Sequence, residues 1–137
     1  MVKNIVKDTE FLQRPSEPAT RKDKKVAEDL LDTLKANSIT CVGLAANMIG
    51  VSKCIIAVQV GKHNVAMFNP KIVKHSAESV EVMEGCLSLL GQRPAKRYEW
   101  IEVEYQDIKF KTQKQRFTGF TAEIIQHEID HCQGILI

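Results

Sequence analysis

The sequence of 137 residues lacks any strong excess of charge of one sign. Its 19 Lys and Arg residues against 17 Asp and Glu residues give a formal net charge of +2 at pH 7. Such a balance creates no large electrostatic field, so we expect no direct binding to nucleic acid or to anionic lipid. The chain also has no apolar run of membrane-spanning length, and its first five residues lack the apolar core of a secretion signal. A cytoplasmic protein without membrane contact is therefore expected.

The 4 cysteines form no C-x-x-C pair; they are Cys41, Cys54, Cys86 and Cys132. In a reducing compartment we do not expect them to form disulfides. A free cysteine is often a small buried hydrophobe, which suits Cys54 in the apolar run 54–58. The composition, 44% hydrophobic and 26% charged, is typical of a globular protein, and the length predicts one domain, 1–137.

Hydrophobic periodicity predicts an amphipathic helix over 21–37, with Thr20 and Asp23 in the spacing of a capping box. A second helix follows Thr118 or Thr121 as its cap and runs through the histidine-rich C-terminal segment. Between the helices, β-branched and alternating patterns predict short strands and a hairpin, at 54–60, 65–68, 71–75, 101–106 and 107–117. The expected fold is α+β, with mixed or antiparallel strands around a central C-terminal helix and with the helices on one side of the sheet.

The strongest functional signal is the pentapeptide His127-Glu128-Ile129-Asp130-His131. On a helix the two histidines are offset by about 40° and face one cavity, whereas Glu128 lies about 100° from His127. Two imidazoles so spaced can hold one metal ion, and the carboxylate can take a proton from a water at that ion. The pattern indicates a metal-dependent hydrolase, and a solvated polar helix face is the alternative that it leaves open.

A catalytic metal ion usually has three protein ligands, so the histidine pair needs a partner from elsewhere in the chain. Cys86 is the candidate, because Gly85 before it permits a close backbone approach and a thiolate is a good metal ligand. Taken alone, a cysteine after a glycine more often reflects simple packing.

Several segments together resemble one known family. Glu84-Gly85-Cys86-Leu87-Ser88 and the segment 126–131 resemble the second and third motifs of the peptide deformylases. These enzymes remove the formyl group from the N-terminal methionine of new bacterial or organellar proteins. Further segments match the family in order and spacing, namely 12–20, 42–50 (the first motif), 68–70 and 97–107.

The resemblance implies a single divalent metal ion held by Cys86, His127 and His131, with Glu128 as general base and acid. In the family the ion is commonly Fe(II), and this ligand set also suits Zn(II), Ni(II) or Co(II). The substrate would be an N-formyl-methionyl peptide, with the ribosome as a further partner. The backbone N–H of Leu87 and a glutamine that closes the first motif would stabilise the oxyanion.

The resemblance also implies an ion pair between Glu84 and Arg97 that braces the segment carrying Cys86.

The first motif departs from the family pattern Gly-x-Gly-x-Ala-Ala-x-Gln at two positions. Cys41 replaces the first glycine, and Met48 replaces the glutamine. A thioether cannot donate a hydrogen bond, so the loss of this donor is expected to reduce turnover by about 10²–10³. A neighbouring amide, Asn47 or Gln126, is the alternative donor.

Two functions therefore remain open. The first is a deformylase with reduced activity, and the second is a catalytically degenerate metal-binding homologue that binds peptide termini or a partner protein. The presence of Glu128, which is not itself a metal ligand, favours the enzyme. Hydrolysis of ordinary peptide bonds fits less well, because a Cys-plus-two-His ligand set differs from that of zinc proteases.

Overall fold

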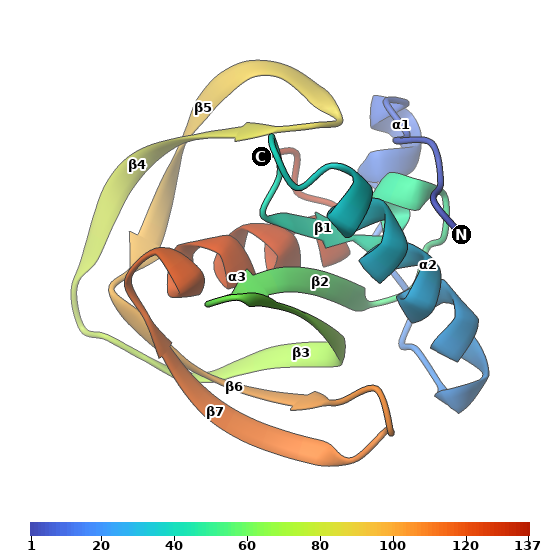
Figure 1. Ribbon diagram of the computed structural model, residues 1–137. Helices are drawn as coiled ribbons and strands as arrows, with labels where there is room; N and C mark the ends of the chain where they lie inside the picture. The colour runs from blue at the N-terminus through green and yellow to red at the C-terminus, as the bar shows by residue number, and fades with distance from the viewer.

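A C-terminal helix lies at the centre of the fold, with strands on several sides of it (Figure 1). The computed structural model describes residues 1–137. The elements in chain order are α1 (Thr9–Leu12), η1 (Arg21–Asp23), α2 (Lys24–Ala36), β1 (Gly43–Ala45), η2 (Ala46–Ile49), β2 (Ile55–Val60), β3 (His63–His75), β4 (Ser79–Cys86), β5 (Leu89–Tyr98), β6 (Trp100–Gln106), β7 (Thr112–Thr118) and α3 (Gly119–Cys132). No helix among them is both long enough and apolar enough to cross a membrane.

The strands form a 5-stranded sheet in the order β1-β2-β3-β6-β7 and a separate 2-stranded sheet made of β4 and β5. Every neighbouring pair is antiparallel. The β4–β5 hairpin arches beside the N-terminal part of α3 (Figure 1). The predicted α+β class, with antiparallel strands around a C-terminal helix, is confirmed.

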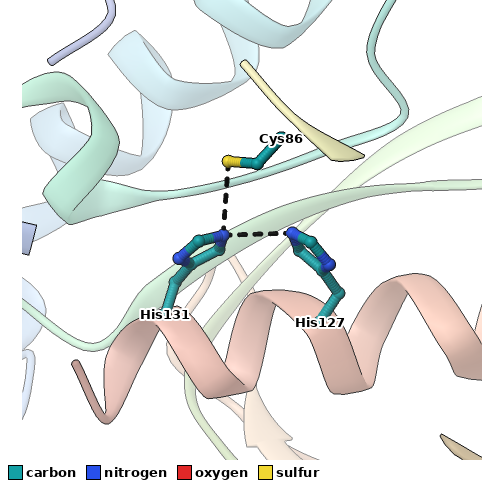
Figure 2. A group of neighbouring side chains, drawn as sticks. All are labelled: Cys86, His127 and His131. Carbon is teal, nitrogen blue, oxygen red and sulfur yellow. Dashed lines mark hydrogen bonds between the residues drawn. The ribbon is translucent and has the colours of Figure 1, made fainter. Parts of the chain in front are cut away.

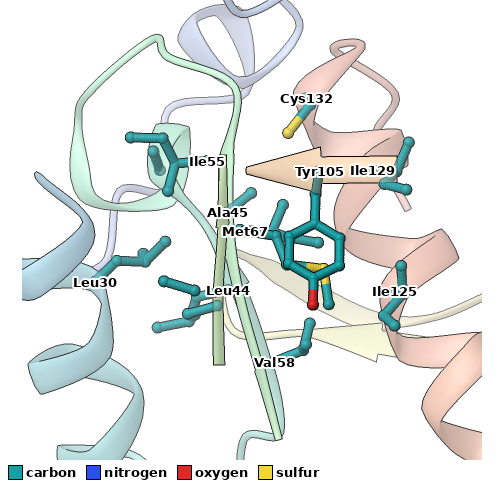
Figure 3. Packing of buried hydrophobic residues seen from close by; sticks show 14 of the residues in the cluster. Leu30, Leu44, Ala45, Ile55, Val58, Met67, Tyr105, Ile125, Ile129 and Cys132 are labelled. Atoms are coloured by element: carbon teal, nitrogen blue, oxygen red, sulfur yellow. The ribbon is translucent and has the colours of Figure 1, made fainter. Parts of the chain in front are cut away.

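The two long helices cover opposite faces of the large sheet, so the expectation that both lie on one side is wrong. Residues 55–58 of β2 are buried without a break, which requires cover on both faces of the strand. In Figure 3, Leu30 of α2 packs on one side of the sheet edge, and Ile125 of α3 packs on the other. The uninterrupted apolar run in β2 is the feature of the sequence that indicates cover on both faces of the sheet.

Segments 65–68 and 71–75, predicted as separate strands, are the two ends of β3. Its pairing with β6 shifts register between Phe68 and Lys71, where Asn69 has φ 52°. Pro70 has no N–H to donate, so a bulge here leaves no donor unpaired. The Asn69 side chain bonds the N-terminal segment through both the N–H and the carbonyl of Ala19, at 2.8 and 3.0 Å.

The β4–β5 hairpin was not predicted from the sequence. Only Glu84 on β4 is buried, and on β5 only Ala95 and Arg97 are buried. A hairpin with so few buried side chains does not produce the apolar alternation by which strands are recognised.

The helix starts follow local capping chemistry in one case and not in the other. Before α2, the Thr20 hydroxyl accepts from the N–H of Lys22 and the Asp23 carboxylate accepts from the N–H of Thr20, so the predicted capping box is present. It leads into one 3₁₀ turn before the α-helix. Thr118 precedes α3, but its side chain makes no capping hydrogen bond.

Candidate metal centre

The end of β4 and the C-terminal half of α3 bring three metal-binding side chains together (Figure 2). The Sγ atom of Cys86 lies 3.5 Å from Nε2 of His131, and that nitrogen lies 3.1 Å from Nε2 of His127. The ligand atoms of the three residues all lie within 4.8 Å of one another. The two histidine rings and the cysteine sulfur thus point to one common centre, as predicted.

These separations fit one ion. In a tetrahedral site with metal–nitrogen bonds of about 2.0–2.1 Å and metal–sulfur bonds of about 2.3 Å, neighbouring ligand atoms stand roughly 3.4 to 3.6 Å apart. His131 is fully buried and its Nε2 atom faces Cys86 and His127 rather than water. One thiolate and two imidazoles suit a divalent transition metal. The residues present can therefore hold a single divalent ion.

A buried network of charged side chains orients the first histidine. Glu84 accepts a hydrogen bond from Nδ1 of His127 at 2.8 Å, which leaves Nε2 directed at the ligand cluster. Arg97 donates to both oxygens of Glu84, at 2.6 and 2.9 Å, and to Asp130 at 2.7 Å. The predicted Glu84–Arg97 pair is confirmed. Its contacts with His127 and Asp130 were not predicted, because residue spacing does not show which side chains meet between β4, β5 and α3.

The charges in this network shift several ionisation constants. Burial opposes ionisation of Glu84, but hydrogen bonds from His127 and Arg97 prevail and lower its pKa to about 2. Burial together with the positive His127 and Arg97 lowers the pKa of His131 to about 3, so this imidazole is neutral, as a ligand must be. Burial also disfavours the charged form of His127, yet its hydrogen bonds with Cys86 and Glu84 raise its pKa to about 10. A metal cation at Nε2 would compete with that proton.

A cavity of about 550 Å³ adjoins the ligand cluster. Its wall comes from three parts of the chain: the segment around β1, the β4–β5 hairpin and the stretch of α3 from Phe120 to Glu128. Cys86 and His127 reach this wall, and so does Glu128, which follows His127 on α3. Two of the three candidate ligand residues therefore line a space large enough for part of a peptide.

Glu128 is a buried carboxylate, and one of its oxygens makes no hydrogen bond. The residue is 4% exposed, and its Oε1 atom has no hydrogen-bond partner in the protein. Burial raises the pKa of Glu128 to about 7, a value suited to accepting and returning a proton near neutral pH. A cation at the ligand cluster would lower this pKa, since it favours the charged form.

The close approach of α3 to the sheet depends on Gly43 of β1. A Cβ atom at this position would lie 2.7 Å from Cγ2 of Ile124 and 2.9 Å from Oε2 of Glu128. A Cβ on Gly85 would have no neighbour nearer than 3.6 Å. The expectation that Gly85 permits a tight backbone approach is therefore wrong, and the glycine that does so is Gly43.

Met48 lies in the cavity wall and is 1% exposed. The only polar contact of its sulfur is with the backbone N–H of Ala45, at 3.5 Å. Neither neighbouring amide lines the cavity, because Asn47 donates to the carbonyl of His131 at 3.0 Å and Gln126 bonds both backbone groups of Tyr98. The alternative that one of them replaces the missing glutamine is not supported.

Leu87 occupies the two-residue turn that joins β4 to β5, directly after Cys86. It lines the cavity, and no turn or loop hydrogen bond uses its backbone N–H.

Comparison with known proteins places the whole chain in one group. The family model described as "Polypeptide deformylase" matches residues 2–137. A peptide deformylase of Clostridium beijerinckii is 56% identical over 137 residues, covering 100% of both chains. One from Dictyoglomus thermophilum is 39% identical over 122 residues, covering 88% of this chain and 78% of that one.

Solved structures agree with the sequence relatives. The class I type b peptide deformylase from Acinetobacter baumannii, solved with bound Met-Ala-Ser, superposes with a TM-score of 0.89 at 28% identity over 99% of this chain and 97% of that chain. The peptide deformylase of Thermotoga maritima gives a TM-score of 0.89 at 30% identity, over 99% and 95% of the two chains. Peptide deformylases are metallohydrolases that release the formyl group from N-terminal formylmethionine. With a matching fold, a Cys/His/His group able to bind one metal ion and relatives matched along its full length, this chain belongs to the polypeptide deformylase family.

Proposed function

We propose that this chain hydrolyses the formyl amide of N-formyl-methionyl peptides, with Cys86, His127 and His131 as ligands of one Fe(II) ion. The observation that carries the proposal is Glu128, whose unpartnered carboxylate oxygen lies beside the three ligands in the wall of the same cavity. A metal-binding protein freed from catalysis would gain nothing from a buried, unsatisfied carboxylate, which costs about 1–3 kcal/mol or more to maintain.

The proposed chemistry follows from the placement of these groups. A bound divalent ion would supply Lewis-acid activation of a water molecule and of the formyl oxygen. Glu128 accepts a proton from the attacking water, whose oxygen forms a bond to the formyl carbon. Glu128 then returns the proton to the amine nitrogen as the carbon–nitrogen bond breaks, giving formate and a free N-terminus. The backbone N–H of Leu87 donates to the oxygen on which negative charge develops.

Met48 sets the expected rate. It stands where the family's glutamine would donate a second hydrogen bond to that oxygen, and a thioether cannot donate. Loss of one such donor costs about 10²–10³ in turnover. The alternative function, a degenerate homologue that binds peptide termini or a partner protein, also draws its support from Met48.

The remaining parts of the proposal concern context. We take residues 1–137 as one catalytic unit, supported by a single contiguous core that includes α2, the large sheet and α3. The near balance of charge and the peptide deformylase relatives support a cytoplasmic setting, with nascent chains at the ribosome as the source of substrate.

The deciding experiment is a formate-release assay on formyl-Met-Ala-Ser, run anaerobically with Fe(II), Ni(II) or Zn(II). The natural protein is expected to release formate slowly, and fastest with Fe(II). Glu128→Ala should retain stoichiometric metal but release none. Met48→Gln should raise turnover by about 10²–10³, because it restores the donor.

Each alternative has its own result. Stoichiometric metal without formate release from the natural protein, followed by activity in Met48→Gln, identifies the degenerate homologue. Equal and high activity of the natural protein and Met48→Gln would show that the lost donor does not limit this enzyme.

A further inference from the structure

The two histidines of the ligand cluster differ in how their second ring nitrogen is held. Nδ1 of His127 donates to Glu84 at 2.8 Å. His131 is fully buried, and its Nδ1 atom has no hydrogen-bond partner in the protein. In Figure 2 this nitrogen lies on the side of the ring away from His127. When Nε2 binds a metal ion, the neutral ring carries its proton on Nδ1, so His131 needs an acceptor there.

Asn47 has an unused acceptor and is in direct contact with His131. The residue lies on η2 and is 1% exposed. Its Nδ2 group donates to the carbonyl of His131 at 3.0 Å and to that of Leu12 at 3.5 Å. These two bonds fix which end of the amide is the nitrogen, and the opposite end, Oδ1, is buried and makes no hydrogen bond. An unpaired donor and an unpaired acceptor therefore belong to two buried residues that touch.

One water molecule would satisfy both atoms. Buried polar groups are paired as a rule, and an ordered water completes the pairing where no protein group reaches. Such a water typically makes about three hydrogen bonds. The hydroxyl of Ser16 is a further buried oxygen without a partner, and the N–H of Ser16 donates to the carbonyl of Cys132, directly after His131, at 2.8 Å. The polar groups that a bridging water requires are thus present around the C-terminal end of α3.

We infer that Asn47 is a positioning residue for the metal ligand His131, acting through one buried water. The water accepts a hydrogen bond from Nδ1–H of His131 and donates one to Oδ1 of Asn47. This pairing holds the tautomer in which Nε2 is free to bind the ion, as Glu84 does for His127. The inference rests on the proposed function for the role of His131 as a ligand, but it concerns metal binding rather than the reaction.

The first test is a crystal structure of the natural protein loaded with Zn(II). An ordered water is expected within about 3.2 Å of both Nδ1 of His131 and Oδ1 of Asn47. If no water joins the two atoms, or if Nδ1 of His131 donates to another group, the inference is wrong.

The second test is a competitive titration with Co(II), which requires no turnover. Asn47→Leu keeps the approximate size of the side chain but removes the acceptor, so it should weaken Co(II) affinity by about 10–100-fold and shift the visible absorption of the bound ion. Thr33→Val is the matched control. Thr33 on α2 is fully buried, and its hydroxyl donates to Asp29 at 2.7 Å and accepts from the N–H of Lys3 at 2.9 Å. Its replacement should lower stability but leave Co(II) affinity and absorption unchanged.

A third variant separates the acceptor of Asn47 from the two bonds that its Nδ2 group makes. Asn47→Asp keeps an oxygen for the water but cannot donate to the carbonyls of Leu12 and His131. It should therefore lower the midpoint of thermal unfolding, yet bind Co(II) more tightly than Asn47→Leu does. If Asn47 only fastened the end of α3, Co(II) affinity would instead fall in step with the unfolding midpoint in all the variants.

The outcomes for the inference and for the proposed function are distinct. Unchanged Co(II) affinity and absorption in Asn47→Leu would overturn the inference at any level of enzyme activity. Tight Co(II) binding without formate release would count against the proposed function alone. Failure of the natural protein to bind any divalent metal would overturn both.

Discussion

The substitution Gly43→Ala tests how closely the catalytic helix must pack on the sheet. The new methyl group would lie 2.7 Å from Cγ2 of Ile124, about 1 Å inside an ordinary carbon–carbon contact, and 2.9 Å from Oε2 of Glu128. Both neighbours are held in the interior, since Ile124 is 6% and Glu128 4% exposed. The carboxylate must therefore shift by several tenths of an ångström or the helix must move.

Two magnitudes follow from this crowding. Overpacking of a buried site typically costs about 1–3 kcal/mol, which in a protein of this size lowers the midpoint of thermal unfolding by roughly 3–10 °C. A displacement of about 1 Å at a reacting group can cost about 10²-fold, so a shift of several tenths should reduce kcat by about tenfold. KM should change less, because the groups that line the outer cavity stay in place.

The assay combines thermal unfolding with formate release by the metal-loaded protein. Gly85→Ala is the matched control for stability, since a Cβ there meets only ordinary contacts at 3.6 Å or more and its unfolding midpoint should stay close to that of the natural protein. If Gly43→Ala unfolds at the same temperature and turns over at the same rate as the natural protein, the helix and Glu128 are not held by this contact and the reasoning is wrong.

Two further predictions concern the metal centre and the scaffold. Glu84→Gln should weaken metal affinity by about 10–100-fold in a competitive metal titration, because it removes the charge that orients His127. Glu81→Gln, at an exposed position of β4, is the control and should leave the affinity unchanged. Equal affinities of the two variants would contradict the role of Glu84 in holding His127. Asn69→Ala should lower the free energy of unfolding by about 2–3 kcal/mol, because it removes the hydrogen bonds to Ala19 and puts alanine at a positive φ. Asn69→Gly should lower the free energy of unfolding by less, because glycine adopts a positive φ without strain. Denaturant unfolding separates the two, and the same loss in both variants would show that the backbone angle is not costly there.

The composition of the proposed metal site could be predicted from the sequence because its strongest part is local. His127 and His131 share a helix face by the geometry of one α-helix, and Glu128 follows from the same five residues. Cys86 lies in another part of the chain; its chemistry made it only a candidate, and the resemblance of its flanking residues to a family motif singled it out. The cluster of Cys86, His127 and His131 in the fold agrees with that prediction.

The sheet and helices were predicted where the burial pattern is regular. Strand β6 alternates buried residues with partly or fully exposed ones, and α2 has one apolar stripe after its capping box. The β4–β5 hairpin has no such pattern, since almost none of its side chains is buried, and the prediction missed it. The placement of α2 and α3 on opposite faces depended on how β2 is covered, which periodicity within each helix does not specify.

The sequence by itself predicted which side chains can bind a metal ion, since side-chain chemistry and helical periodicity are local properties, and the resemblance to the family showed which donor the first motif lacks. Only the tertiary structure decided that Gly43 rather than Gly85 is the point of close approach at the site, and that Glu84 holds His127. Each of these depends on contacts between β1, β4 and α3. Such contacts arise from the packing of segments far apart in the chain, and no local pattern encodes the distance between them.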